Sequence, residues 1–578
     1  MSKTKNTNVT EPFELNSIYG LFERGARLYP GHNIYRFNRT KEEEVQVTYD
    51  DYLVFLQKMI LAFESIGAKG NKVIVMGETT VQWITSYVST VSAGGVIVPL
   101  DPGLLEDEIV NFINLSEAKI VVYSKTYEKL FEERGNDLKT VEMFIETDKS
   151  TFTLTTEAEY EAKRYTSFNN ILALGETLYK ELENGFALPE QDIEKLSILL
   201  FTSGTTGTSK GVMLSQKNII AVMKGIEPTL NILTKDDSVL SVLPVHHTYE
   251  MSAGILAPML YGCTISISDG IKYVAKNIKQ FQPTIMTLVP LFAQTLYKTI
   301  MRGVQKQGKE KTLKTGIRIS NFLMKFKVDI RAKLFAQVLE ALGGKLKYFV
   351  VGGAALDPAL VDNYKSLGIH VSQGYGITEC APLISVIPLD DYNPTSCGKL
   401  MPGMQIMIDK ENPEDKTGEI VVKGDNVMLG YYNAPEITAE VLNNGWFRTG
   451  DYGYVDKNGY VYITGRKKNI IIASNGKNVF PEEIEEYIEA IPFVEEVVVV
   501  GRDSKDGQVS IVAIVVPNEE ECEKAGYVDD EIVYEVIKAE IDKINKKLVV
   551  YKHVDKIELR KEPFERNTSR KIKRFLIK

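Results

Sequence analysis

Short apolar runs alternate with amphipathic stretches early in this 578-residue chain, and this alternation constrains the fold more than any other feature. Residues 73–77, 95–99 and 119–123 are rich in β-branched side chains and have the length of strands. Residues 81–92 and 106–115, which separate them, have helical spacing. Strands that alternate with helices of about 10–15 residues indicate βαβ units. We therefore predict an α/β fold with mostly parallel, helix-flanked sheets.

The chain is too long for one hydrophobic core, so we expect more than one domain. Residues 418–466 have hairpin-like patterning, and we expect a distorted, β-barrel-like region there. After Arg466 the composition changes, and Pro481 with the acids behind it is typical of a helix start. We predict a disordered segment over 1–12, a large domain over 13–467 and a small mobile α+β domain over 468–578.

Composition excludes several classes of protein. A net charge of −9 argues against a general nucleic-acid binder. The four cysteines are scattered without a C-x-x-C pair, so they indicate neither a zinc site nor a disulfide framework. The N-terminus lacks an apolar leader, and no apolar run reaches the about 18 residues that a spanning helix needs. We expect a cytoplasmic protein that at most lies against the inner membrane surface.

Residues 202–211 contain only Gly, Ser, Thr and Lys, and they directly follow an apolar run. Glycines let the backbone approach a ligand closely, and successive N–H groups can form an anion-binding nest. Lys210 precedes the last glycine, so the segment is not a Walker A loop, in which the lysine follows it. The pattern predicts a loop that binds a polyphosphate.

Polar and aromatic side chains follow later strand-like runs. His246, His247 and Tyr249 come after the apolar residues 238–244, and Gly374 to Glu379 follow another such run. Ligands of open α/β sheets bind beyond the carboxyl ends of the strands, so these groups could face the same crevice as the loop. Two solvated loop histidines remain an alternative.

Residues 298–347 carry thirteen Lys or Arg against three acids in an otherwise acidic chain, with apolar residues at near-helical spacing. A basic amphipathic segment can lie on an anionic membrane. The alternative is an ordinary helix pair with a solvated basic face.

In this order, residues 202–211, 374–379, 445–451, Gly465-Arg466 and a late lysine resemble the adenylate-forming superfamily of acyl-CoA synthetases, luciferases and nonribosomal adenylation domains. The similarity extends over about residues 15–575, and it is most like that of a bacterial long-chain fatty-acid–CoA ligase. Residues 243–250, residues 341–356 and Lys468 carry this narrower resemblance. It implies that ATP activates a fatty acid, with pyrophosphate release, and that the acyl group passes to coenzyme A.

The resemblance also implies residue roles for ATP. The loop would hold the β- and γ-phosphates, Tyr375 would stack on adenine, and Asp451 and Arg466 would bind the ribose and phosphates. Glu379, with Thr202, would bind Mg²⁺, a cation that prefers oxygen ligands. The full nucleotide and cofactor set is Thr202, Ser203, Gly204, Thr205, Thr206, Gly207, Lys210, Gly353, Ala354, Gly374, Tyr375, Gly376, Thr378, Asp451, Arg466, Lys468, Gly476 and Lys571.

The catalytic residues implied are Lys571, Thr206, Glu379 and His247. Lys571 would contact the α-phosphate and the incoming carboxylate, and His247 would lie near the acyl carboxylate. The family often has Gly before this lysine, whereas this chain has Arg570, and Lys573 competes for the role.

Lys468 stands at the family's hinge, about which the small domain rotates between half-reactions to deliver either Lys571 or the loop 474–478. Gly476 of that loop would line a tunnel for the pantetheine arm of coenzyme A. Two alternatives stay open: transfer to an acyl-carrier protein, and an inactive lipid-binding member of the fold.

Overall fold

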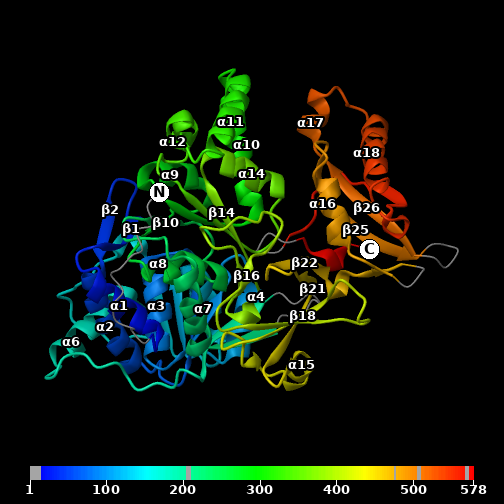
Figure 1. Ribbon diagram of the computed structural model, residues 1–578. Coiled ribbons are helices and arrows are strands. Elements are labelled where there is room, and N and C mark those ends of the chain that lie inside the picture. The colour runs from blue at the N-terminus through cyan, green and yellow to red at the C-terminus, as the bar shows by residue number, and fades with distance from the viewer. Residues whose placement is uncertain (1–14, 203–209, 474–476, 504–508, 567–571, 578) are drawn as a thin grey trace. The chain divides into compact units, whose positions relative to one another are not determined.

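The computed structural model describes residues 15–202, 210–473, 477–503, 509–566 and 572–577 (Figure 1). Its described residues form two compact units. The predicted domain boundary at Lys468 differs from the boundaries of these two units and stays a prediction. The predicted disordered segment 1–12 lies outside the described residues. Unit 1 takes in residues 15–202, 210–405 and 423–445, and unit 2 takes in the described parts of 406–422 and 446–577.

The first sheet of unit 1 has eight strands in the order β19-β9-β8-β4-β3-β5-β6-β7. Strands β8, β4, β3, β5, β6 and β7 are parallel to their neighbours in this order. Strand β9 pairs antiparallel with β8 on one side and with β19 on the other. The runs predicted as strands become β3, β4 and β5, so the predicted fold class is confirmed. The bounds are β3 Lys72–Met76, β4 Val96–Leu100, β5 Ile120–Ser124, β6 Met143–Thr147, β7 Tyr165–Ser167, β8 Leu196–Thr202, β9 Lys210–Ser215 and β19 Gly430–Tyr431.

The second sheet of unit 1 has nine strands in the order β16-β15-β14-β13-β12-β10-β11-β1-β2. Strands β14, β13, β12, β10, β11 and β1 are parallel to their neighbours in this order. Antiparallel strands lie at both edges of the sheet, β15 and β16 next to β14, and β2 next to β1. The bounds are β1 Asn33–Asn38, β2 Glu44–Thr48, β10 Ser238–Ser241, β11 Thr264–Ile267, β12 Ile285–Leu288, β13 Tyr348–Val351, β14 His370–Gly376, β15 Leu383–Val386 and β16 Lys399–Leu400.

Several helices of unit 1 begin where a hydroxyl side chain accepts a free backbone N–H. Thr48, Thr80 and Ser215 cap α2, α3 and α7 in this way. The helix bounds are α1 Ile18–Leu28, α2 Tyr49–Ser65, α3 Val81–Ser92, α4 Glu106–Ser116, α5 Glu128–Arg134, α6 Phe168–Lys180, α7 Gln216–Thr229, α8 Ala257–Met259, α9 Val274–Phe281, α10 Pro290–Lys306, α11 Glu310–Met324, α12 Arg331–Leu334, α13 Ala336–Ala341, α14 Pro358–Leu367 and α15 Pro435–Val441.

Unit 2 has its own cores around a three-stranded sheet, in which β26 pairs antiparallel with β25 and parallel with β27. The hairpin-like patterning of 418–466 corresponds to a five-stranded sheet in which β21 and β22 form an antiparallel hairpin. The bounds are β17 Gln405–Asp409, β18 Gly418–Lys423, β21 Trp446–Val455, β22 Val461–Arg466, β23 Ile471–Ile472, β24 Asn478–Val479, α16 Pro481–Glu489, β25 Val494–Asp503, β26 Val509–Pro517, α17 Glu519–Lys524, α18 Asp530–Asn545 and β27 Lys556–Leu559, and strand β20 of this sheet, Leu442–Asn443, falls in unit 1.

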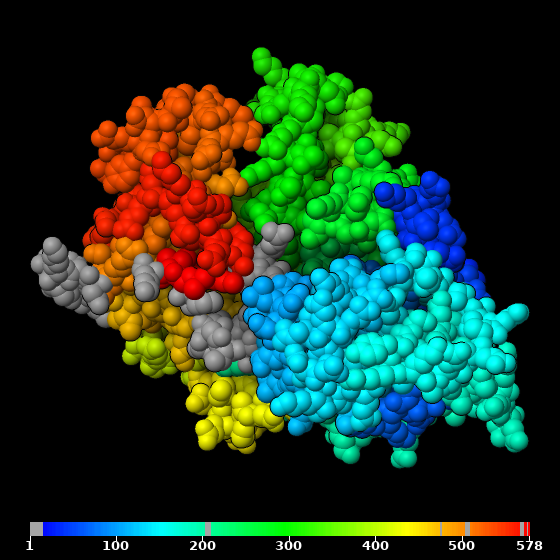
Figure 2. Space-filling view, turned by 180° about the vertical axis from the view of Figure 1, so that it is seen from behind, coloured from blue at the N-terminus to red at the C-terminus, as the bar shows by residue number. Residues whose placement is uncertain are grey.

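The basic segment 298–347 folds into the end of α10 and the helices α11, α12 and α13. In Figure 1 the green helices α10 and α11 project from the rest of unit 1, and in the space-filling view of Figure 2 the green atoms stand out at the top. Strand β10 ends at Ser241, three residues before Pro244, so it is shorter than the apolar run 238–244. Among the described residues, no helix is both long and apolar enough to cross a membrane.

Candidate functional site

The carboxyl ends of three parallel strands of unit 1 lead to several of the residues singled out from the sequence. Strand β10 leads to the two histidines, β13 to Gly353 and Ala354, and β14 ends in Gly374, Tyr375 and Gly376, just before Thr378 and Glu379. Parallel pairing through β12 brings these ends to one edge of the sheet. The structure therefore gathers these predicted residues at the edge where ligands bind in open α/β sheets.

The predicted phosphate loop connects the antiparallel strands β8 and β9. Thr202 and Lys210 are opposite one another in this pair, and Thr202 Oγ1 donates to the Lys210 carbonyl over 3.4 Å. The loop residues between them, Ser203, Gly204, Thr205, Thr206 and Gly207, lie outside the described residues.

Tyr431 connects the end of this loop to the predicted magnesium ligand. Its hydroxyl donates to Glu379 Oε1 over 2.9 Å, and Lys210 Nζ lies 4.9 Å from the centre of its ring. Burial and the adjacent Glu379 carboxylate raise the pKa of Tyr431, so the phenol stays protonated and remains a donor. Tyr431 thus contacts both the Lys210 ammonium and the Glu379 carboxylate and holds their positions relative to each other. We call these three residues the Lys210–Tyr431–Glu379 series.

The backbone around Glu379 is held in place by the segment that carries Tyr431. Met428 N donates to the Glu379 carbonyl over 2.8 Å, and the short strand β19 pairs with β9. A carboxylate is a hard oxygen ligand of the kind that Mg²⁺ prefers, so the Glu379 side chain fits the predicted metal.

The glycines near the ends of β13 and β14 have packing reasons that the sequence did not reveal. A Cβ at Gly376 would lie 1.8 Å from the Pro382 carbonyl oxygen, so only glycine fits there. A Cβ at Gly352 would lie 3.1 Å from the Tyr249 ring. Gly353 has a φ of +89°, a conformation that favours glycine. Tyr375, the predicted adenine contact, is buried.

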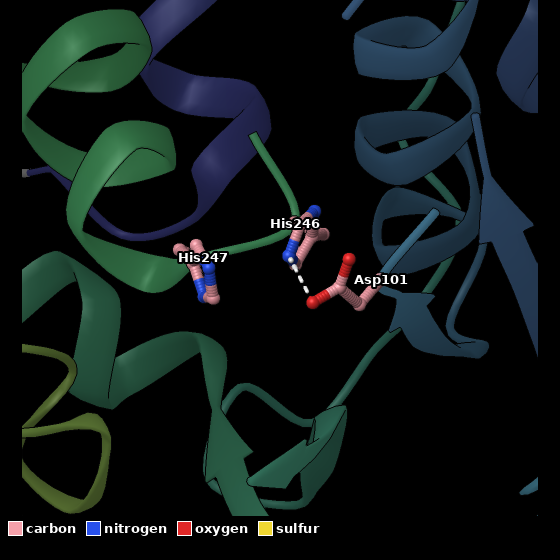
Figure 3. Close-up of side chains that lie close together, drawn as sticks. All are labelled: Asp101, His246 and His247. Carbon is pink, nitrogen blue, oxygen red and sulfur yellow. Dashed lines mark ion pairs between the residues drawn. The ribbon is translucent and has the colours of Figure 1, made fainter. Parts of the chain in front are cut away.

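The two histidines after β10 lie beside an aspartate that sequence reasoning missed (Figure 3). Asp101 directly follows β4, and its Oδ2 lies 3.4 Å from His246 Nε2. The rings of His246 and His247 are 4.1 Å apart, and one ligand atom from each of the three residues lies within 4.8 Å of the others. This set of two imidazoles and one carboxylate suits a transition metal such as Zn²⁺ better than Mg²⁺. The interpretation of His246 as a solvated loop residue is wrong, because its side chain is only 7% exposed.

Glu250, which follows the histidines in the chain, has a buried carboxyl group, and sequence reasoning missed it. Ser241 Oγ and Thr287 Oγ1 donate to its two oxygens, the latter over 2.7 Å. Burial raises the pKa of Glu250 to about 7, although these hydrogen bonds oppose the shift. The neighbouring Tyr249 donates to the Val350 carbonyl over 2.8 Å.

In unit 2, Asp451 and Arg466 are opposite each other in the β21–β22 hairpin, and Arg466 Nε lies 2.8 Å from Asp451 Oδ1. Lys468 follows in the 3₁₀ turn Lys467–Asn469. Burial, with the positive charges of Arg466 and Arg574, lowers the pKa of Lys468 to about 8. These three predicted residues therefore lie close together.

Lys571 and Gly476 lie outside the described residues, but both flanks of Lys571 are anchored. Arg566 forms an isolated antiparallel bridge with Ile572 and an ion pair of 2.7 Å with Glu496. Lys573 N donates to the Glu565 carbonyl over 2.8 Å, and Arg574 pairs with Glu485.

Comparison with protein families decides the class. The family described as AMP-binding enzyme matches residues 22–432, and its C-terminal domain family matches residues 468–577. The chain belongs to the AMP-binding enzyme family. The adenylate-forming superfamily predicted from the ordered motifs is thereby confirmed.

Relatives of this AMP-binding enzyme include long-chain-fatty-acid–CoA ligases. That of Mycobacterium bovis is 27% identical over 468 residues, which cover 76% of this chain and 73% of the relative. That of Escherichia coli is 27% identical over 473 residues, with 78% and 77% covered. That of the mouse is 26% identical over 520 residues, with 85% and 76% covered.

Solved structures support the fold. An anthranilate CoA ligase in complex with anthranoyl-AMP has a TM-score of 0.76 at 19% identity, with 97% of this chain and 96% of that chain covered. A fatty acyl CoA synthetase of Mycobacterium tuberculosis has a TM-score of 0.65 at 22% identity, with 97% of each chain covered.

Proposed function

We propose that this AMP-binding enzyme is a long-chain fatty-acid–CoA ligase. The observation that carries the proposal is the Lys210–Tyr431–Glu379 series at the end of the phosphate loop, in a chain whose relatives are named as such ligases. Adenylation brings two anions together, so it needs fixed positive charge and oriented donors more than a general base.

In the first half-reaction, an oxygen of the fatty-acid carboxylate attacks the α-phosphorus of ATP, and the bond to pyrophosphate breaks. Lys210 and the loop 202–211 bind the β- and γ-phosphates, and Glu379 holds Mg²⁺, which when bound neutralises phosphate charge. Tyr375 contacts adenine, Asp451 accepts from the ribose hydroxyls, and Lys571 contacts the α-phosphate.

In the second half-reaction, the thiolate of coenzyme A attacks the acyl carbon, and AMP leaves. The small domain, taken as 468–578, turns about Lys468. Lys571 then leaves the site of the acyl-adenylate, and the loop that contains Gly476 takes its place. Hinges are a few residues at element ends that absorb φ/ψ changes, and the 3₁₀ turn after β22 is such a position.

The proposal also includes the acyl acceptor and a membrane contact. The acceptor is coenzyme A, with an acyl-carrier protein as the alternative that uses the same thiol chemistry. The protein also contacts an anionic membrane through residues 298–347, a proposal supported by the thirteen Lys or Arg and the interleaved apolar residues of that segment.

The test is a pyrophosphate-release screen over acids from acetate to oleate, with no acceptor, with coenzyme A and with a holo-carrier protein. We expect release with palmitate and oleate, and a thioester only with coenzyme A. Lys571→Ala should abolish release, and Lys573→Ala should not. No release with any acid would refute the proposal and favour the inactive lipid-binding alternative, and a thioester formed only on the carrier would favour the other acceptor.

A further inference from the structure

The side chains of Asp101, His246 and His247 reach one another from two different sheets of unit 1. Asp101 directly follows β4 of the eight-stranded sheet, and both histidines follow β10 of the nine-stranded sheet. Among the described residues, no other group of three histidine, cysteine or acidic side chains is close enough to share a metal ion. We call these three residues the Asp–His–His cluster.

The distance between His246 and Asp101 is that of two ligands of one metal ion. His246 Nε2 lies 3.4 Å from Asp101 Oδ2. An N–H···O hydrogen bond is shorter, at about 2.7–3.2 Å. Two ligand atoms at the tetrahedral angle around Zn²⁺, each about 2.0–2.2 Å from the ion, are separated by about 3.3–3.6 Å. The observed separation therefore fits an edge of a zinc tetrahedron better than it fits a hydrogen bond.

His246 Nε2 is also a buried nitrogen that lacks a hydrogen-bond partner within the described parts of the chain. The side chain is only 7% exposed, and Figure 3 shows its ring facing the Asp101 carboxylate. Buried polar atoms of native proteins are usually satisfied by a partner, a water molecule or an ion. A metal ion between the imidazole and the carboxylate would satisfy both groups.

His247 adds a third ligand of the same kind. Its ring centre lies 4.1 Å from that of His246, and one ligand atom from each of the three residues lies within 4.8 Å of the others. A rotation of side chains closes the remaining separation. Two imidazoles and one carboxylate are the ligands of many catalytic zinc sites, which keep the fourth position open. Mg²⁺ prefers ligand sets made of oxygen alone.

We propose that the Asp–His–His cluster is a binding site for a divalent transition metal ion, and that Zn²⁺ is the ion that its geometry fits. Asp101, His246 and His247 supply three ligands, and the fourth position is open to water or to an anion. This site is built from residues other than Glu379, the predicted magnesium ligand.

Zn²⁺ at this site slows adenylation, and this consequence rests on the proposed ligase function. The resemblance implies that His247 lies near the carboxylate of the acid. An oxygen of that carboxylate fills the open position, and the ion withdraws electron density from it. The carboxylate is then a weaker nucleophile toward the α-phosphorus of ATP. Binding of the ion itself does not depend on activity.

The experiment is a titration of the untagged full chain with Co²⁺, without ATP or Mg²⁺. Co²⁺ replaces Zn²⁺ and absorbs visible light, whereas the filled d shell of Zn²⁺ does not. The cluster variants are His246→Gln and Asp101→Asn. His370→Gln is the matched control, because His370 Nε2 is also buried without a hydrogen-bond partner in the described chain but belongs to no such cluster.

Wild type and His370→Gln should show the intense absorption of four-coordinate Co²⁺, saturating at one ion per chain and abolished by Zn²⁺. Both cluster variants should bind at least about tenfold more weakly, because loss of even an outer partner of a metal ligand costs about 10–100-fold in affinity. Absorption that does not saturate, or that is equal in wild type and cluster variants, would overturn the proposal. A strong thiolate-to-cobalt band would overturn it too, because it would assign the ion to a cysteine.

A measurement on wild type alone guards against variants that fail to fold. An ion that binds only the folded protein stabilises it, so saturating Zn²⁺ should raise the midpoint of urea unfolding. An unchanged midpoint would contradict the site.

A second readout separates the metal site from the ligase function. In the pyrophosphate-release assay with Mg²⁺, added Zn²⁺ should slow wild type and His370→Gln. His246→Gln should keep its metal-free rate when Zn²⁺ is added. Equal inhibition of wild type and His246→Gln would place the inhibition elsewhere and remove the effect on adenylation. Zn²⁺ binding without pyrophosphate release from any acid would keep the metal site and refute the ligase proposal.

Discussion

At the scale of single residues, Tyr431 contacts both Lys210, the cation of the predicted phosphate loop, and Glu379, the predicted magnesium ligand. Its ring lies under Lys210 and its hydroxyl donates to Glu379. It touches neither nucleotide nor metal in the proposed mechanism, so it is a positioning residue.

Tyr431→Phe removes the hydroxyl and keeps the ring. A hydrogen bond to a charged group contributes about 1.5–3 kcal/mol. We therefore expect pyrophosphate release to slow by about tenfold or more at limiting Mg²⁺ and to recover partly at high Mg²⁺. Tyr432→Phe is the matched control, because the Tyr432 ring, which covers Lys72, is kept. An unchanged Mg²⁺ dependence in Tyr431→Phe would contradict the positioning role.

Glu250 should make the protein less stable as the pH rises. Its pKa of about 7 exceeds its ordinary value of 4.5, so its full contribution is present below pH 4.5 and is lost as the pH rises to about 7. Between these values the free energy of unfolding should fall by about 1.4 kcal/mol per pH unit on account of this group.

Glu250→Gln cannot ionise, so urea unfolding of this variant should show a flatter pH profile than wild type over that range. The exposed Glu340→Gln is the control for the loss of one carboxyl group. Parallel profiles for wild type and Glu250→Gln would show that Glu250 does not titrate in this way.

At the scale of elements, the 3₁₀ turn Lys467–Asn469 is the connection at which the hinge is proposed. Lys467 is tied to Glu419 over 2.8 Å, and Asn469 to Glu482 over 2.6 Å, whereas Lys468 lies between these two anchors. A change of backbone angles is therefore most simply absorbed at Lys468.

Lys468→Pro fixes φ at this position and should arrest the small domain in one orientation. We expect one half-reaction to persist and the other to be lost, measured as pyrophosphate release from ATP and as thioester formation from supplied acyl-adenylate. Lys468→Ala removes the same ammonium group but leaves the backbone free, so it should support both. Normal rates of both steps in Lys468→Pro would rule out the hinge.

At the scale of the whole molecule, each compact unit has its own apolar core. Leu288 lies in a core of unit 1, and Ile537 lies in a core of unit 2, both with 0% exposure. We expect scanning calorimetry to resolve two transitions. Leu288→Ala and Ile537→Ala should each destabilise a different one, by about 2–5 kcal/mol for a buried aliphatic truncation. If instead there is a single transition and both variants lower its midpoint temperature, the two units unfold together.

The order of strands and helices in unit 1 could be predicted from the sequence, because alternation of β-branched runs with helical spacing is a local property. Strands β3, β4 and β5 of unit 1 lie where their residues indicated, and so does helix α16 of unit 2. The near-helical spacing of apolar residues along 298–347 predicted helices there but not their buried side: Ile317 is partly buried, whereas Ile319 and Phe322 are exposed. Spacing alone does not say which side of a helix meets the core.

By itself, the sequence determined the α/β class, the phosphate-loop motif and the superfamily, because each depends on residues that are near in the chain and on their order. Only the tertiary structure decided which distant residues meet. Tyr431 reaches Glu379 across 52 positions, and Asp101 meets His246 because β4 and β10 end close together in space although they belong to different sheets. Such pairings follow from strand order and packing, which no local pattern encodes.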